Sequence, residues 1–197
     1  MGRPREYDER AASALLAAAE RIVAEEGLEA LSVRRVASEV NVTTRAVYSL
    51  YGSKDGLVVA LGARAFHLLK AALDALPTTS DPASDLVEAG AVVFRRFALE
   101  HPALLQIGFL HTGMPPDLAS QFRSASDHAL SSLLARIERI AKNGLLGSRG
   151  VMDATLAFQA ICEGLVAVEL RCMIPESQAE RFWRDALRAL VVGWGAT

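Results

Sequence analysis

Apolar residues recur at helical spacing along the chain, in stretches separated by glycine, proline or asparagine. In the first stretch Leu15, Ala19, Ile22 and Val23 form one stripe, and Gly27 follows as a residue that ends helices. No stretch shows the strict alternation of a half-buried strand. Alanine, the strongest helix former, occurs 34 times in 197 residues. The pattern predicts an all-α protein.

The breaks between these stretches predict about nine helices. The expected ranges are 8–26, 33–40, 44–51, 54–75, 83–100, 102–111, 117–143, 151–173 and 176–194. The clearest linker is 77–82, in which four short polar residues lie between two prolines. We expect two domains, residues 1–53 and residues 54–197.

Composition excludes several classes of protein. With 51% hydrophobic residues and a net charge of −2, the chain is not intrinsically disordered. Its longest stretch without Asp, Glu, Lys or Arg is the 16 residues of 101–116, whereas a membrane span needs about 20 apolar residues. We therefore expect no membrane partner. The polar start has no signal-peptide pattern, which favours a cytoplasmic protein.

Catalytic and metal-binding patterns are missing from the sequence. There is no G-x-S-x-G, H-E-x-x-H or phosphate-loop motif, and the four histidines are scattered. Cys162 and Cys172 are too few and too far apart for a metal knuckle or a disulfide framework, so we expect buried thiols. We expect no enzyme, no cofactor and no metal site.

Two short helices joined by a tight turn, 33–40 and 44–51, are a helix-turn-helix candidate. Ala37 is small enough for a helix crossing, and Asn41 tolerates the positive φ of a sharp turn. Ser32 is a good N-cap for the first helix, and Thr43 or Thr44 for the second. The apolar residues that would pin the two helices together are Val36, Val40, Val42 and Val47. An ordinary helical hairpin has the same spacing, so this pattern alone leaves DNA binding open.

A wider pattern surrounds this candidate. It comprises an Ala-rich opening helix, Gly27-Leu28-Glu29-Ala30-Leu31-Ser32-Val33, Val36-Ala37, Val42-Thr43-Thr44-Arg45-Ala46-Val47-Tyr48, Tyr51, and Ser53-Lys54-Asp55 with Leu57. The run from Ala11 to Leu61 resembles the DNA-binding domain of the tetracycline-repressor family of bacterial transcription regulators. Three positions depart from the family pattern: Asn41 replaces the usual Gly, Tyr51 the usual Phe, and Leu50 a ring residue that often touches the DNA backbone.

The resemblance implies roles for individual residues in 1–53 and at the start of the next helix. Thr43, Thr44 and Arg45 would face the major groove, with Arg45 either bidentate to guanine or bound to phosphate. Tyr48 would contact a base methyl or the backbone, unless it packs in the core. Ser32, Arg34 and Lys54 would contact phosphates, and Arg3 and Arg5 would reach the neighbouring backbone or minor groove. For Arg34 and Arg35 the alternative is an ordinary solvated helix face.

The last two predicted helices carry the pattern of a dimer interface. Members of the family commonly dimerise through their last two helices, as a four-helix bundle. The residues that would form this homodimer are Gly164, Ala167, Phe182, Trp183, Ala186, Leu190 and Trp194. The alternative for the tryptophan face is packing inside one subunit, and both can hold because the last helix has two apolar faces.

The resemblance also implies a pocket for a small-molecule effector within residues 54–197. Its candidate lining is Phe94, Phe97, His101, Leu105, Phe109, His111, Phe122, Phe158, Cys162 and Glu163. For the aromatic residues core packing is the alternative, and His101 alternatively caps a helix. Glu163 lies in an apolar stretch and must find a partner: a cationic ligand, His101 or His111, the solvent, or the dimer seam. Parts of 101–105 and 163–170 resemble a subclass named for a Trp-His-Gly signature, although here Glu163 takes the His position and the Trp is absent.

Together these features predict a dimeric regulator of double-stranded operator DNA, most simply a repressor released by a ligand. A ligand-independent or activating regulator is the alternative. A helical interaction module without DNA binding would leave Thr43, Thr44 and Arg45 unexplained.

Overall fold

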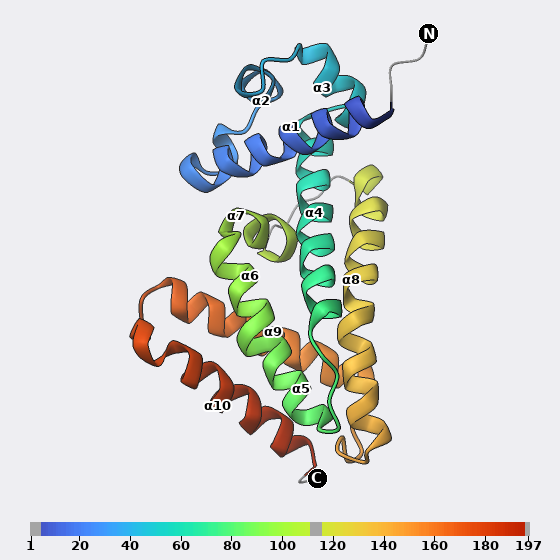
Figure 1. Cartoon of the computed structure of the whole chain (residues 1–197), viewed down its shortest axis with the longest axis vertical. Helices are drawn as coiled ribbons and strands as arrows, with labels where there is room; N and C mark the ends of the chain where they lie inside the picture. Colours follow the sequence, from blue (N-terminus) through green and yellow to red (C-terminus); the bar gives the residue numbers. More distant parts are fainter. Residues whose placement is uncertain (1–4, 111–115, 196–197) are drawn as a thin grey trace. The chain divides into compact units, whose positions relative to one another are not determined.

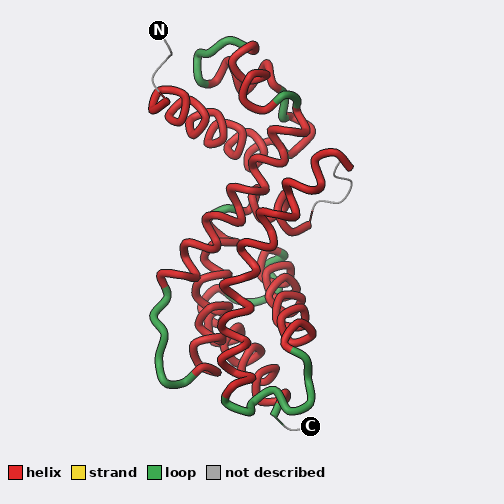
Figure 2. Tube along the Cα trace, turned by 90° about the vertical axis from the view of Figure 1, so that its right-hand side faces the viewer, coloured by secondary structure: helices red, strands yellow, loops and turns green. Residues whose placement is uncertain are grey.

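The computed structural model of the chain describes residues 5–110 and 116–195. Within these ranges every regular element is helical and no strand occurs (Figures 1 and 2). The elements are α1 (Arg5–Glu26), η1 (Leu28–Ala30), α2 (Val33–Glu39), α3 (Thr44–Tyr51), α4 (Lys54–Ala75), α5 (Pro82–Glu88), η2 (Ala89–Phe94), α6 (Arg95–Glu100), α7 (Pro102–Leu105), η3 (Gln106–Leu110), α8 (Pro116–Lys142), α9 (Val151–Leu170) and α10 (Glu176–Trp194). The π-helical segments η2 and η3 continue their neighbours, so the described residues form the nine predicted helical stretches. The all-α fold is confirmed.

The chain divides into two compact units. The first comprises 1–67 and 101–126, and the second comprises 68–100 and 127–197, so α4 and α8 contribute to both. These units are defined by which residues contact one another, whereas the boundary expected between residues 53 and 54 separates a DNA-binding part from a ligand-sensing part. The functional boundary therefore stays a prediction.

The core of the first unit is built on the predicted stripe of α1. Leu15, Ala19 and Ile22 are buried, and α1 packs against α2 and α7. The first turns of α4 complete this core with Leu57 and Leu61, both fully buried. The expected helical periodicity thus sets which face of α1 is buried.

The core of the second unit forms where α10 packs against α5, η2 and α9. Trp183, Leu187, Val191 and Trp194 of α10 are buried there. Gly90 allows the close approach, because a Cβ atom at this position would lie 2.5 Å from Leu187 Cδ1. The tryptophan face of the last predicted helix therefore packs within the chain.

A half-buried carboxylate, that of Glu169, fixes three helices of the second unit to one another. Arg95 Nη2 of α6 donates to Glu169 Oε1 of α9 at 2.6 Å, and Trp183 Nε1 of α10 donates to Glu169 Oε2 at 2.7 Å. The hydrogen bonds that Arg95 donates to Glu169 raise the pKa of Arg95, although burial acts in the opposite direction. Glu169 is charge-paired, which is the condition for a carboxylate in such a position.

Two helices, α4 and α9, are long and apolar enough by length and composition to cross a membrane. The sequence criterion above missed them because it required an uninterrupted apolar stretch, and Arg64 and Glu163 interrupt these two. Half of the α4 window and a third of the α9 window are buried inside the structure. Core helices of helical domains pass the same test, so the finding is weak evidence for a membrane.

The two cysteines differ in environment. Cys162 is buried as expected, and burial raises the pKa of its thiol well above the ordinary value. Cys172 is exposed, just after the end of α9, with a positive φ of 55°. The expectation of two buried thiols was wrong for Cys172, because the helix ends at Leu170 rather than extending to residue 173.

Candidate nucleic-acid interface

Both helices of the predicted helix-turn-helix begin with a side-chain cap. Ser32 Oγ accepts a hydrogen bond from the backbone N–H of Arg35 at 3.3 Å, and Thr43 Oγ1 accepts one from the backbone N–H of Ala46 at 3.2 Å. Each cap satisfies an N–H that has no partner within its helix. Of the two threonines considered as caps, the structure selects Thr43 and leaves the side chain of Thr44 exposed.

The turn between α2 and α3 is closed as its sequence predicts. Asn41 adopts a positive φ of 53°, and the N–H of Val42 donates to the carbonyl oxygen of Ala37 at 2.9 Å. Asparagine supports this conformation in place of glycine, because its short polar side chain lowers the cost of a left-handed backbone. The substitution of Asn for Gly therefore preserves the turn.

Small and β-branched residues hold α3 against the rest of the first unit. Val36, Ala37 and Val47 are buried, while Val40 and Val42 are half-buried. Tyr51 is also half-buried, and its hydroxyl donates to the carbonyl oxygen of Ala12 in α1 at 3.0 Å. Burial raises the pKa of Tyr51 above its ordinary value, so this hydroxyl stays protonated at neutral pH. The far end of α3 is thus fixed to α1.

The side chains predicted to face DNA lie on the surface of the first unit. Ser32, Arg34, Thr43, Thr44 and Arg45 are exposed, and Lys54 is half-buried. Tyr48 is 53% exposed, which excludes the core packing considered for it. Leu50, at the position where relatives often have a ring, is exposed as well. Arg3 lies outside the described residues, as does the side chain of Arg5.

The arginines of this region fall into two groups. Arg35 pairs with Glu26 through Nη1 and Oε2 at 2.6 Å, and Arg21 pairs with Glu39 at 3.1 Å. The hydrogen bonds from Arg35 hold the pKa of Glu26 below its ordinary value. In the described part of the chain, no carboxylate pairs with Arg34 or Arg45. Arg35 thus fits the alternative of an ordinary helix face, whereas the guanidinium groups of Arg34 and Arg45 are available to bind a partner.

This arrangement is suited to contact with duplex DNA. The capped start of α3 presents two hydroxyls and a guanidinium, which are groups that hydrogen-bond to base edges in the major groove. The exposed cation on α2 and the capped start of α4, where Ser53 Oγ accepts from the N–H of Gly56 at 3.0 Å, supply groups of the kind that contact phosphates.

The residues predicted for an effector pocket fall in different units. Phe94, Phe97, Phe158, Cys162 and Glu163 belong to the second unit, whereas His101, Leu105, Phe109 and Phe122 belong to the first. His111 lies outside the described residues. Phe94, Phe97, Phe158, Cys162 and Leu105 are buried, which fits core packing as well as the lining of an internal pocket. Their role in effector binding stays a prediction. Within the first unit the rings of Phe109 and Phe122 meet Phe66 edge-on, with centroid distances of 5.2 and 5.3 Å.

Two polar residues of that predicted pocket have protein partners. Gln159 Nε2 donates to Glu163 Oε1 at 2.8 Å, one helical turn away on α9. His101, at the N-terminus of α7, makes no capping bond with its side chain; its Nδ1 lies 2.7 Å from Glu20 Oε1. The Glu163–His101 pair considered above would join residues of different units and stays a prediction.

The predicted dimer residues separate into buried and accessible ones. Trp183 and Trp194 are 0% and 2% exposed within one chain, so they belong to the core and not to a surface that a second copy reaches. Phe182 is 45% exposed and Gly164 is exposed, while Ala167, Ala186 and Leu190 are half-buried.

The structure adds apolar residues on α9 that the sequence reading missed. These exposed residues are Met152, Leu156 and Ile161. Ala160 and Gly164, which the sequence already indicates as small residues that allow close helix approach, are also exposed. Together they form one stripe, whose spacing of about four residues was a readable signal. The signal was hidden because α9 is apolar on all sides.

Comparisons with known proteins agree with this geometry. Residues 15–61 match the family model described as bacterial regulatory proteins, tetR family, and residues 87–190 match the tetracyclin repressor-like C-terminal domain. No curated protein matches the chain. The Trp-His-Gly subclass is not among the matching models and stays a prediction.

Solved structures share the fold at low identity. A protein of unknown function from Rhodococcus sp. RHA1 is 23% identical with a TM-score of 0.81, over 93% of this chain and 95% of that one. The TetR family transcriptional regulator PfmR from Thermus thermophilus is 21% identical with a TM-score of 0.68, over 91% and 97%. The fatty acid degradation regulator FadR from Bacillus halodurans is 13% identical with a TM-score of 0.75, over 97% of each chain.

The C-terminal model alone spans more than half of the chain, and the N-terminal model covers the helix-turn-helix whose caps, turn and exposed polar start are described above. The chain therefore belongs to the tetR family of bacterial regulatory proteins and is a DNA-binding transcriptional regulator.

Proposed function

We propose that this regulator binds a palindromic operator as a homodimer, represses transcription there, and is released by a small-molecule effector. Residues 1–53 would bind DNA, and residues 54–197 would sense the effector and form the dimer. The protein would act in the cytoplasm and would have no catalytic activity.

The observation that carries DNA reading is the exposed start of α3. Thr44 and Arg45 extend from a helix that Thr43 caps and Tyr51 fixes to α1, so their position is set before DNA arrives. A preorganised recognition helix loses less conformational entropy on binding. Arg45 is the side chain suited to guanine, through two parallel hydrogen bonds to O6 and N7.

Dimerisation is supported by the exposed apolar surface of α9 and α10. We call this surface the α9–α10 stripe; it comprises Met152, Leu156, Ala160, Ile161, Gly164, Phe182, Ala189 and Val192. None of these residues is charged, and small residues among them permit close helix approach. A second copy of the chain is the proposed occupant, because two helix-turn-helix units on a two-fold axis read half-sites about 34 Å apart.

Release follows from linkage between two ligands. An effector that prefers a conformation with a different separation of the recognition helices lowers DNA affinity by its differential affinity for the two states, and DNA lowers effector affinity by the same factor. A coupling of about 1–3 kcal/mol is ordinary. Repression is the proposed outcome, since a dimer on its operator blocks access to the same DNA.

The decisive experiment is selection from a random duplex library with the purified full chain at a fixed salt concentration. Enrichment of a palindrome is the expected result, and salt dependence of the affinity reports the phosphate contacts. Enrichment of a site without two-fold symmetry would contradict the dimer. Absence of binding at low salt, by protein refolded free of co-purified ligand, would overturn the DNA-binding proposal.

A further inference from the structure

The second unit contains a surface pocket of about 490 Å³ beside the last turns of α4. Residues of α4, of the linker that follows it, and of α8 line the pocket. They are Lys70, Leu73, Asp74, Leu76, Thr78, Ser131, Ser132, Ala135, Arg136 and Arg139. Three cations and one carboxylate thus surround the space, and none of these residues belongs to the effector pocket expected from the sequence.

Two of the three cations are neutralised by carboxylates. Lys70 Nζ lies 2.6 Å from Asp74 Oδ2, and Ser132 Oγ donates to the other oxygen of Asp74 at 2.6 Å. Arg139 Nη1 lies 2.7 Å from Asp85 Oδ2. Asp85 is further engaged, because the N–H and the hydroxyl of Thr79 both donate to it.

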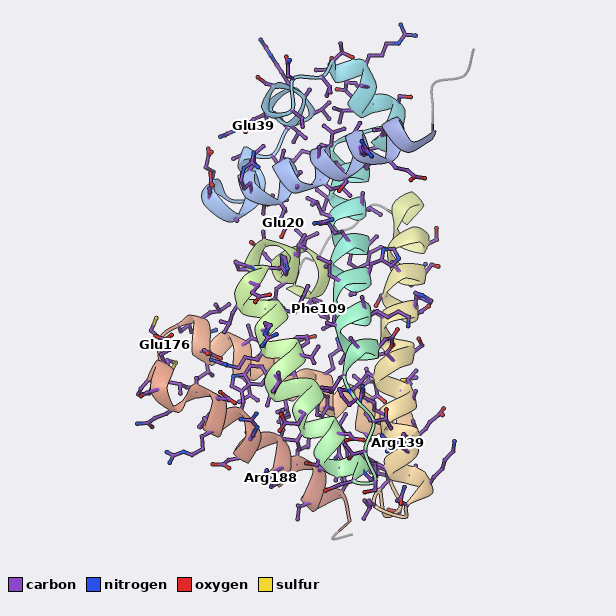
Figure 3. All side chains as sticks on the ribbon, viewed as in Figure 1. Glu20, Glu39, Phe109, Arg139, Glu176 and Arg188 are labelled. Carbon is purple, nitrogen blue, oxygen red and sulfur yellow. The ribbon has the colours of Figure 1, made fainter. Side chains whose placement is uncertain are left out.

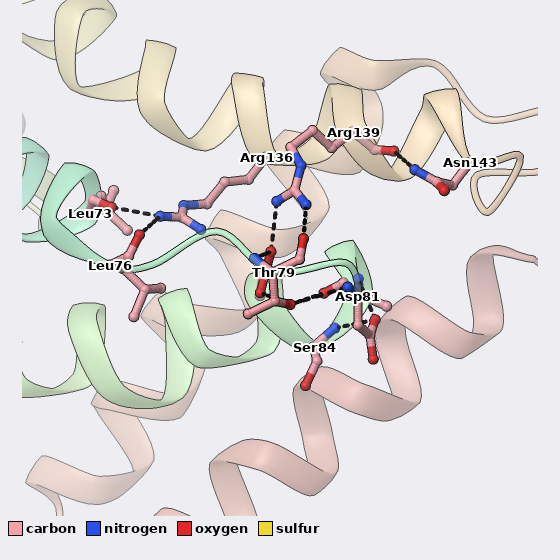
Figure 4. A network of polar contacts seen from close by, with 10 residues as sticks. Leu73, Leu76, Thr79, Asp81, Ser84, Arg136, Arg139 and Asn143 are labelled. Carbon is pink, nitrogen blue, oxygen red and sulfur yellow. Dashed lines mark hydrogen bonds and ion pairs between the residues drawn. The ribbon is translucent and has the colours of Figure 1, made fainter.

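Arg136 is the exception. Its residue is only 7% exposed, and its Nη2 donates to the carbonyl oxygens of Leu73 and Leu76 at 2.7 and 3.0 Å. These bonds cap the end of α4. Nη1 is buried and has no hydrogen-bond partner within the described residues, and no carboxylate pairs with this guanidinium. Figure 4 shows the side chains of Arg136 and Arg139, one turn apart on α8, extending toward the segment that joins α4 to α5.

The electrostatics of this guanidinium are unfavourable as it stands. Burial lowers the pKa of Arg136, the negative charges of Asp85 and Asp74 act in the opposite direction, and the positive charge of Arg139 lowers it. Arginine nevertheless stays protonated in proteins, so the pocket wall holds a buried charge that forms no direct ion pair with a carboxylate of the described residues. A bound anion would supply a direct counter-ion.

We propose that the pocket binds a small organic anion whose carboxylate or phosphate group pairs with Arg136. Lys70 provides a further donor, since an ammonium group has three N–H bonds and two are used on Asp74 and Ser132. Leu73, Leu76 and Ala135 provide apolar surface for the carbon part of the ligand. Carboxylates and phosphates match the planar donor fork of arginine. This site does not depend on the proposed operator or dimer.

The test is calorimetric titration of the full chain with inorganic phosphate and, separately, with butyrate, at constant ionic strength set by chloride. Saturable binding of one or both is expected. Binding of phosphate alone assigns a phosphate-bearing ligand, and binding of butyrate alone a carboxylate. If neither ion binds saturably, the proposal is wrong.

A matched pair of variants locates the binding without removing the cap of α4. Ala135 is exposed on α8, so both Ala135→Glu and Ala135→Gln are compatible with the helix. The Glu variant places a negative charge in the pocket and should weaken anion binding at least tenfold relative to the Gln variant of equal size. Equal affinities for the two variants would place the anion elsewhere. Arg188→Gln, on an exposed arginine of α10 away from the pocket lining, should leave the affinity unchanged.

Discussion

Glu20 of α1 and His101 at the start of α7 are joined by a 2.7 Å contact between Oε1 and Nδ1. The other oxygen of Glu20 accepts from Arg64 Nε of α4 at 3.3 Å, so one carboxylate links three helices of the first unit. Glu20 lies on the side of α1 that faces α7 (Figure 3). This carboxylate ties the first helix of the DNA-binding domain to segments far from it in the sequence.

Replacing Glu20 with Gln should therefore destabilise the first unit. The amide cannot form the ion pair with Arg64, and loss of a charged hydrogen bond costs about 1–3 kcal/mol. The free energy of unfolding, measured with urea, should fall by that amount. Glu25→Gln, on an exposed residue of the same helix, should change it by less than about 0.5 kcal/mol. Equal stability of the two variants would show that the Glu20 contacts contribute nothing.

Thr43 and Thr44 are adjacent threonines with separable roles. Thr43→Ala removes the cap of α3 and should cost about 1 kcal/mol of stability. Thr44→Ala removes an exposed hydroxyl with no capping bond and should leave stability within about 0.5 kcal/mol. Thermal unfolding of both variants checks this difference. If Thr44→Ala is destabilised as much as Thr43→Ala, the assignment of the cap to Thr43 alone is wrong.

Arg45 and Arg34 are expected to differ in what they contact on DNA. Arg45→Ala should weaken binding to the selected operator by about 1–3 kcal/mol and relax preference at one base position. Arg34→Ala should weaken binding to all sequences alike and reduce the slope of affinity against salt by about one. Fluorescence anisotropy with a panel of single-base variants measures both. Uniform weakening by Arg45→Ala would reassign Arg45 to a phosphate.

The α9–α10 stripe should be sensitive to charge if it is the dimer interface. Leu156 is 53% exposed in the single chain, and Leu156→Arg would place an unpaired cation in an apolar interface, which costs several kcal/mol. The dissociation constant of the dimer should rise by about 100-fold or more. Sedimentation velocity over a concentration series reports it. The control variant Leu99→Arg, at an exposed leucine of α6 outside the stripe, should remain dimeric. If Leu156→Arg also remains dimeric, the dimer interface does not include the α9–α10 stripe.

Asp85 should make stability depend on acid pH. Burial favours the protonated form, but the hydrogen bonds from Arg139 and Thr79 outweigh it and hold the pKa of Asp85 below its ordinary value. Because the pKa of Asp85 is lower in the folded state than in the unfolded state, where it is about 3.9, the charged carboxylate stabilises the fold at pH values above about 3.9. This stabilisation is lost as the pH falls through the pKa of the folded state.

Asp85→Asn should consequently be less stable than the parent by about 1–3 kcal/mol near neutral pH. The difference should shrink as the pH is lowered below about 4, because the parent then loses the same contribution. Urea unfolding at a series of pH values measures it, with Asp127→Asn at an exposed position of α8 as the control. A difference that stays constant down to pH of about 3 would mean that Asp85 is not charged in the native state.

Much of the local structure was predictable because its causes lie within a few residues. The cap at Ser32, a threonine cap at position 43 or 44, the turn at Asn41 and the helix ends at Gly27 and Gly52 follow from local hydrogen bonding and backbone conformation. The resemblance over residues 11–61 added the roles of the exposed residues on α3, and the family match over 15–61 agrees with it.

Other features depended on pairings between distant segments. Trp183 and Phe182 are neighbours on a helix with two apolar faces, and the periodicity does not say which face the chain covers itself. Packing against α5 and η2 buries Trp183 and leaves Phe182 exposed. Likewise, nothing in the sequence indicates that His101 contacts Glu20, and Arg136 carried no sequence signal at all.

The sequence by itself determined the helices, the turn at Asn41 and the family, since each is encoded by spacing along one segment. Only the tertiary structure decided that Glu20 contacts His101, that Arg136 is buried with its Nη1 unpaired among the described residues, and that α9 exposes Leu156. The physical reason is that burial and charge pairing are properties of contacts between segments, and those contacts exist only once the helices have packed.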